Sequence, residues 1–255
     1  DSQTAFEDLM SEGSVPWALV LGNHEFDRGR PYWQYIDPTN HCILAQELMP
    51  GERRYYEFTY EGVQFLVLNN NSDTSDKQNY APCQIPNDLL NHSSSAQRTW
   101  FRRNLAKESN WKIACGHRTY YGIENYASRD NIHFSEDYAE TLRTGTVSLL
   151  RDLEDGGVDL FLSGDQHAYS RTVPIKENEA NANDGIAYIV AGTGGGRINR
   201  GDPFPDLSMI PEGTLAAAVG DRHGYLLFEI SNSSLRMEFR EYGTDAVLDS
   251  LRILK

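Results

Sequence analysis

The chain has 255 residues and a formal net charge of −14, and this length is sufficient for one sizeable hydrophobic core. The acidic balance excludes a nucleic-acid-binding protein, because binding to phosphates at physiological salt requires a basic surface. No apolar run approaches the ~20 residues that cross a bilayer, so no membrane span is predicted. We therefore expect residues 1–255 to form a single domain.

The first predicted strand, residues 15–21, is a continuous apolar run that ends directly at the polar tetrapeptide Gly22-Asn23-His24-Glu25. Residues 27–52 are rich in Gly, Pro, Asn and charge, which favours a long surface loop beside that strand end. Residues 54–60 and 63–68 carry the aromatic and branched side chains that strands favour and are separated by Glu-Gly. They are predicted to form a hairpin.

The middle of the chain alternates predicted helices with predicted strands. Residues 95–108 carry an apolar stripe of Ala96, Trp100, Phe101 and Leu105 at helical spacing. Two further, mainly apolar runs predict buried strands, and they end at Gly116-His117 and at Gly164-Asp-Gln-His167. The remaining predictions are strands at 111–115 and 158–162 and helices at 136–143 and 146–155.

The last third adds a strand at residues 186–191 and a closing hairpin of residues 225–230 and 235–242. The strand runs into Gly192-Thr-Gly-Gly-Gly196, which lacks the Gly-Lys-Ser/Thr ending of a phosphate-binding loop. That segment is predicted to be a tight loop that requires glycine backbone angles. Helices between core strands, with hairpins added, predict a layered α/β sandwich.

Three strand ends present side chains that bind metals or transfer protons, namely Asn23 and His24, then His117, then Asp165 and His167. A single Asn or His in such a place is most simply a loop residue with satisfied hydrogen bonds. Because several of them follow three separate strands of the predicted sheet, a shared site at its carboxyl edge is the better interpretation.

The order of these motifs resembles that of the calcineurin-like metallophosphoesterases: Gly-Asn-His-Glu, then Gly-His after a strand, then Gly-x-x-His-x-Tyr. Residues 54–56, 97–100 and 167–171 are similar to the purple (tartrate-resistant-type) acid phosphatases within that superfamily. The resemblance extends from Trp17 to Ile230 and implies a four-layer α/β/β/α sandwich. Tyr169 and Arg171 fit the family's terminal motif, and we expect them to pack behind the site and support it.

The resemblance also implies a reaction, the hydrolysis of a small phosphomonoester by hydroxide bound to a dinuclear metal centre of Fe with Zn, Mn or Fe. Asn23, His117 and Asp165 would bind one metal ion and His167 the other. His24 would orient the phosphoryl group or donate a proton to the leaving oxygen. Arg118 is a candidate for binding the anionic substrate, and an ordinary surface arginine is the alternative.

Two departures from the family pattern leave a second hypothesis open. Asp165 stands where the family's Gly-His-x-His motif has its first His, and no residues before Gly22 match the family's opening Asp-x-Gly and Gly-Asp-x-x-Tyr motifs. We expect that the domain is N-terminally incomplete and that the missing strands lie upstream or on a partner chain. The alternative is a catalytically degenerate subunit with a binding or structural role, holding one metal ion or none.

The remaining signals concern the compartment. Three Asn-x-Ser triplets fit the N-glycosylation pattern, which matters only in a secreted protein, and they predict an extracellular or endomembrane-lumen location. Three cysteines are too few for a disulfide framework. Cys42 and Cys83 are a candidate pair in an oxidising compartment, and Cys115 is predicted to be a buried thiol. The glycosylation candidates are Asn70, Asn91 and Asn232.

Overall fold

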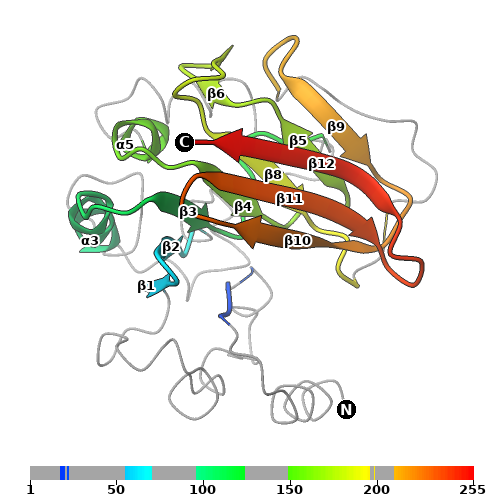
Figure 1. The fold of residues 1–255 in the computed structure, drawn as a ribbon, viewed down its shortest axis with the longest axis horizontal. Coiled ribbons are helices and arrows are strands. Elements are labelled where there is room, and N and C mark those ends of the chain that lie inside the picture. Colours follow the sequence, from blue (N-terminus) through cyan, green and yellow to red (C-terminus); the bar gives the residue numbers. More distant parts are fainter. Residues whose placement is uncertain are drawn as a thin grey trace, which may run out of the picture.

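The computed structural model describes residues 18–20, 22, 55–70, 96–123, 149–195, 198 and 210–255. Their central layer is a seven-stranded sheet of order β1-β2-β3-β4-β8-β5-β9 (Figure 1). The strands of this sheet are β1 Tyr56–Tyr60, β2 Val63–Val67, β3 Trp111–Cys115, β4 Leu160–Ser163, β5 Tyr169–Thr172, β8 Ala187–Ala191 and β9 Leu215–Val219.

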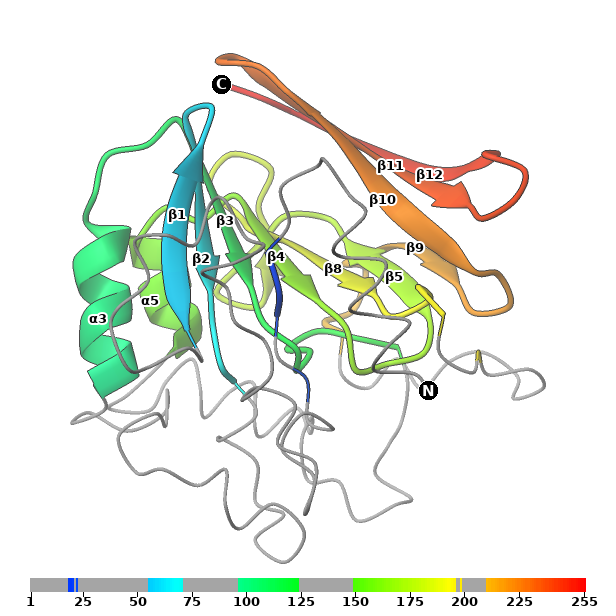
Figure 2. The same ribbon diagram turned by 90° about the horizontal axis from the view of Figure 1, so that it is seen from below.

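The central sheet is covered on both faces (Figure 2). Helices α3 (Ala96–Leu105) and α5 (Leu149–Asp155) lie on one face. A three-stranded antiparallel sheet of β10 (Gly224–Ile230), β11 (Ser234–Glu241) and β12 (Val247–Leu254) covers part of the other. The described residues thus form α, β and β layers of the expected sandwich. A small hairpin of β6 (Ile175–Lys176) and β7 (Glu179–Ala180) stands beside them.

The hairpin predicted from the alternating pattern is confirmed. β1 and β2 pair in antiparallel register from Tyr56 opposite Val67 to Tyr60 opposite Val63. The two turn residues between the strands both have positive φ, 47° in Glu61 and 82° in Gly62. Two consecutive left-handed residues form the turn whose twist matches that of the flanking strands, which explains the sharp Glu-Gly signal in the sequence.

Strands β2, β3, β4 and β8 are parallel neighbours, and the parallel pair of β3 and β4 agrees with the predicted convergence of the two strand ends. Ile113 of β3 pairs with Leu160 of β4, and both side chains are almost completely buried. Parallel strands end at the same edge of a sheet, so the residues that follow β3 and β4 meet at one place. This arrangement positions the candidate site.

Alternate side chains of the central strands enter two hydrophobic cores. The core on the helix side includes Trp100, Phe101 and Leu105 of α3, whereas Ala96, the fourth member of the predicted stripe, is exposed. The core between the sheets takes the opposite face of β3, and Cys115 within it is a buried free thiol as predicted. Burial raises the pKa of this thiol to about 12, so it remains protonated.

Several elements differ from the sequence-based predictions. Residues 18–20 of the predicted first strand lie outside any strand, and the Leu19 carbonyl accepts a hydrogen bond from the Tyr56 hydroxyl at 2.7 Å. Strands β5, β9 and β12 were not predicted, and neither were the two short strands β6 and β7. In the part of the chain that the structure describes, no helix is long and apolar enough to span a membrane.

Candidate functional site

The candidate site begins where β3 and β4 end. His117 follows β3 after one glycine, and Asp165 follows β4 after another. Backbone hydrogen bonds continue the pairing of the two strands beyond their ends, from the Gly116 amide to the Leu162 carbonyl at 3.0 Å and from the Gly164 amide to the His117 carbonyl at 3.1 Å. These bonds hold the two polar side chains side by side.

The carboxylate of Asp165 is the centre of the described part of the site. Its Oδ1 lies 3.3 Å from Nε2 of His117, and Nη1 of Arg118 donates to its two oxygens at 3.0 and 2.8 Å. The Asp165 backbone is left-handed, with φ of 63°, a conformation that aspartate tolerates better than most residues. Burial alone would raise the pKa of this carboxyl, but His117 and Arg118 together lower it to about 2.

The side chain of Asn70, beyond the end of β2, fixes the loop that carries Arg118. Its amide oxygen accepts from the Arg118 backbone N–H at 2.8 Å, and its amide nitrogen donates to the Arg118 carbonyl at 2.8 Å. The Thr119 hydroxyl of the same loop donates to the Gly164 carbonyl at 3.0 Å. The ends of β2, β3 and β4 are therefore joined into one rigid edge.

Gln166 anchors the loop from Asp165 to His167, because its side chain is completely buried. Its Oε1 accepts from the Ile123 backbone N–H at 2.9 Å. The Gly192 amide at the end of β8 donates to the Ala168 carbonyl at 3.1 Å. His167, by contrast, is exposed. Among the residues that the structure describes, no three His, Cys, Asp or Glu side chains form a group able to hold a metal ion.

The pair of His117 and Asp165 suits a divalent metal in kind and in spacing. Imidazole and carboxylate bind Zn²⁺ at about 2.0–2.2 Å, so two donors on one tetrahedral ion lie roughly 3.3 Å apart. The observed separation of Nε2 and Oδ1 is 3.3 Å, a distance at which the two side chains also interact directly with each other. Open catalytic sites normally have three protein ligands. The third predicted ligand, Asn23, lies outside the described residues, as does His24.

A family model described as calcineurin-like phosphoesterase matches residues 1–169, which include both strand ends of this site. The chain belongs to the calcineurin-like phosphoesterase family. The purple acid phosphatase branch is supported by Arabidopsis thaliana relatives. One of them, "Probable inactive purple acid phosphatase 24", is 25% identical over 262 residues, which cover 94% of this chain and 38% of the relative.

A second Arabidopsis thaliana relative, "Purple acid phosphatase 5", is 24% identical over 231 residues, with 85% of this chain and 45% of the relative covered. A solved structure, the purple acid phosphatase PPD1 from yellow lupin (Lupinus luteus) seeds, matches with a TM-score of 0.65 at 22% identity. The match covers 94% of this chain and 41% of the lupin chain, and it confirms the metallophosphoesterase fold. The chain spans less than half the length of these relatives.

The three glycosylation candidates differ in their surroundings. Asn70 is 2% exposed, and the amide nitrogen that would carry a glycan is engaged with Arg118, so the fold leaves no room for an oligosaccharide there. Asn232 is exposed in the turn between β10 and β11. Asn91 lies outside the described residues, together with Cys42 and Cys83.

Sequence reasoning missed the clamp that Asn70 forms and the ion pair of Arg118 with Asp165. Asn70 was considered only as a glycan acceptor, although it follows a strand in the same way as His117 follows another. That common placement at strand ends is the signal that would have found it. The ion pair joins residues 47 positions apart, and no local pattern indicates it.

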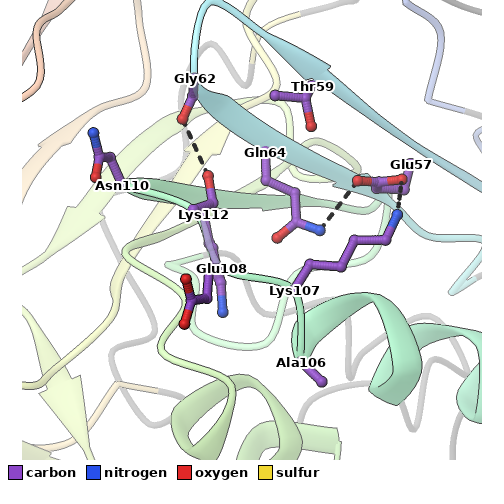
Figure 3. Close-up of a pocket in the computed structure, with 10 residues that line it drawn as sticks. Glu57, Thr59, Gly62, Gln64, Ala106, Lys107, Glu108, Asn110 and Lys112 are labelled. Atoms are coloured by element: carbon purple, nitrogen blue, oxygen red, sulfur yellow. Dashed lines mark hydrogen bonds and ion pairs between the residues drawn. The ribbon is translucent and has the colours of Figure 1, made fainter.

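A hollow of about 730 Å³ lies at the opposite edge of the sheet, at the amino ends of β2 and β3 (Figure 3). Its polar side chains bond to one another: Lys107 Nζ lies 2.8 Å from Glu57 Oε2, and Gln64 Nε2 donates to Glu57 Oε1 at 3.2 Å. Lys112 Nζ donates to two backbone carbonyls, that of Leu105 at the end of α3 and that of Gly156 directly after α5. These groups fasten the helices to the sheet and include none of the predicted metal ligands.

Proposed function

We propose that this chain contributes to a phosphomonoester-hydrolysing site with a dinuclear metal centre at the carboxyl edge of the central sheet. The observation that carries the proposal is the placement of His117 and Asp165, on neighbouring parallel strands, at the separation expected of two ligands of one ion. Metal ions bound there would neutralise phosphoryl charge and lower the pKa of a water molecule.

The chain's own residues take distinct roles in this proposal. His117 and Asp165 hold one ion together with Asn23, and His167 contributes to the second. His24 orients the phosphoryl group or gives a proton to the leaving oxygen. Iron paired with Zn, Mn or Fe is the proposed composition, and a small phosphorylated molecule is the proposed substrate. Segments upstream or on a partner chain complete the second half of the centre.

The His117→Ala variant tests this function. Removal of an imidazole ligand is expected to reduce metal-dependent phosphate release from an aryl phosphate by about 100-fold or more, because even outer partners of metal ligands contribute 10–100-fold. Bound metal, measured by elemental analysis, should fall in parallel. His223→Ala is the matched control, since the His223 ring bonds to the Thr193 carbonyl, at 3.0 Å. Equal rates and equal metal content in wild type and His117→Ala would refute the proposal.

The second candidate function is a catalytically degenerate member of the family that binds or assembles. The observation that favours it is the engagement of both Asp165 oxygens by Arg118, which neutralises the carboxylate. Elemental analysis of the purified protein separates the two candidates. Two metal ions per chain support the hydrolase, whereas metal-free protein that remains inert with Zn²⁺, Mn²⁺ and Fe³⁺ supports the degenerate subunit.

We also propose that the protein is secreted or resides in the endomembrane lumen and carries a glycan on Asn232, in view of the exposed position of this triplet. Treatment of protein from the native source with an N-glycosidase should lower its mass, and Asn232→Gln should remove that site's share of the change. Asn70→Gln should leave the mass change intact, since the Asn70 amide is buried. An unchanged mass after treatment would contradict the proposed glycoprotein.

A further inference from the structure

The carboxylate of Asp165 binds a cation that the protein itself supplies. Arg118 donates to both of its oxygens, and the side chains of Arg118 and Asp165 are only 8% and 11% exposed. Both contacts come from the single nitrogen Nη1, and a charge-assisted hydrogen bond of a guanidinium to a carboxylate in a mostly buried place is among the stronger side-chain interactions in proteins. The charge that would attract a metal ion to Asp165 is therefore already compensated.

The backbone on each side of this pair is fixed, so the pair is a built feature of the edge. Asn70 holds both backbone polar groups of Arg118, and the left-handed Asp165 backbone turns its carboxylate toward the guanidinium. The Nε of Arg118 is buried and has no hydrogen-bond partner among the residues that the structure describes. Among the described residues, the hydrogen bonds of the guanidinium that the structure shows to another side chain are those to the Asp165 carboxylate.

The identity of residue 165 decides whether this pair exists. A neutral histidine, which the family pattern has at this position, carries no charge for Arg118 to neutralise and leaves a ring nitrogen available to a metal ion. Aspartate at the same position offers oxygen ligands but also attracts the neighbouring guanidinium. Any ion bound to Asp165 would lie close to Arg118, because both bind the same carboxylate, and like charges at short range in a buried site repel strongly.

We propose that Arg118 acts as an internal counter-ion that competes with a divalent metal for Asp165 and so sets the metal affinity of the half-site formed by His117 and Asp165. This inference rests on the proposed function, in which the same two side chains are metal ligands. In this proposal Arg118 acts through Asp165 and sets the metal affinity. This role differs from the direct binding of the anionic substrate for which the sequence made Arg118 a candidate. Metal binds to the half-site when the guanidinium leaves the carboxylate.

The test is calorimetric titration of the metal-free protein with Zn²⁺ and, separately, with Mn²⁺. Arg118→Gln removes the charge and is expected to bind the metal about tenfold or more tightly than wild type, since one nearby positive charge is lost. Arg103→Gln makes the same change on the exposed surface of α3 and should leave the affinity as it is. The gain from Arg118→Gln should vanish when Asp165→Asn is added, because the competed ligand is then gone.

A second measurement uses the wild-type protein, so that a poorly folded variant does not decide the result. In the nitrogen NMR spectrum of arginine side chains, the signal of Arg118 should show slow exchange of its N–H protons without metal and faster exchange once Zn²⁺ is added. Equal zinc affinities of wild type and Arg118→Gln, or an Arg118 signal that zinc leaves unchanged, would overturn the inference.

The two readouts keep this inference separate from the proposed function. Metal binding that is tighter in Arg118→Gln, without phosphate release in any variant, supports the competition and refutes the hydrolase. Phosphate release with equal affinities in wild type and Arg118→Gln supports the hydrolase and refutes the competition. Absence of metal binding in both proteins refutes both.

Discussion

Replacement of Asp249 by asparagine is expected to lower the free energy of unfolding by about 3 kcal/mol, because removing one partner leaves a buried charge unpaired. Asp249 Oδ2 accepts from the Tyr169 hydroxyl at 2.5 Å and from Arg171 Nε at 2.7 Å. Its Oδ1 accepts from Arg171 Nη2 at 3.0 Å. These bonds join β5 of the central sheet to β12 of the C-terminal sheet, so the variant weakens the contact between the two layers.

Urea unfolding followed by tryptophan fluorescence measures this change. Asp245→Asn is the matched control, since the Tyr225 hydroxyl donates at 2.7 Å to Asp245, which is exposed in the turn between β11 and β12. An exposed pair of this kind contributes about 0–1 kcal/mol. If the two variants were equally stable, the buried bonds of Asp249 would not be what holds the layers together.

The same carboxylate predicts a dependence of stability on pH. Burial tends to raise the pKa of Asp249, but its bonds with Arg171 and Tyr169 outweigh burial and lower the pKa in the folded state. A group with a lowered folded pKa contributes stability that is complete above its unfolded pKa, about 3.9 for aspartate, and is lost as the pH falls further. Asp249→Asn should therefore lose less stability than wild type when the pH is lowered from about 5 to about 3.

The strands that form the site could be predicted from the sequence because their signals are local. β3 is apolar except for Lys112 and stops at Gly-His, and β4 is apolar up to Ser163 and stops at Gly-Asp. Runs of this kind are typical of parallel strands covered on both faces, which end at one edge. The proximity of His117 to Asp165 follows from that topology. The metal-ligand roles and the hydrolytic reaction were predicted from the resemblance to purple acid phosphatases, because the apolar pattern carries no information about them.

The parts that escaped prediction depend on contacts between distant segments. β5 has only four residues and contains Tyr169 and Arg171, which belong to the recognised motif, so its role as a strand was hidden. β12 alternates apolar and polar residues through Leu251, Arg252 and Ile253, and this period of two is a signal from which the strand could have been predicted. The pairing of Arg118 with Asp165 has no such signal.

Gly192 was predicted to need glycine backbone angles, and the structure gives a different reason for the glycine. None of the positive φ angles of the described glycines belongs to it. A Cβ atom at this position would instead lie 1.6 Å from the backbone carbonyl oxygen of Gln166. In the same loop, Gly195 does have a positive φ of 143°, whereas a Cβ on Gly194 would meet no atom within 4 Å.

Gly192→Ala is accordingly expected to destabilise the protein by about 4 kcal/mol or more, since a side chain that collides with backbone cannot be accommodated by a rotamer change. Gly194→Ala is the matched control from the same loop, and its effect should stay within about 0.5 kcal/mol. Thermal unfolding followed by circular dichroism compares the two variants, and equal midpoints would contradict the close approach.

The collision in Gly192→Ala involves the carbonyl of the residue that separates Asp165 from His167. Relief of the overlap requires β8 and this loop to move apart, and the Gly192 amide bond to Ala168 lies in the path of that movement. The variant should therefore lose zinc affinity as well as stability, when zinc binding is measured at a temperature where the protein is still folded. A folded Gly192→Ala protein that binds zinc as wild type does would show that the metal ligands do not depend on this contact.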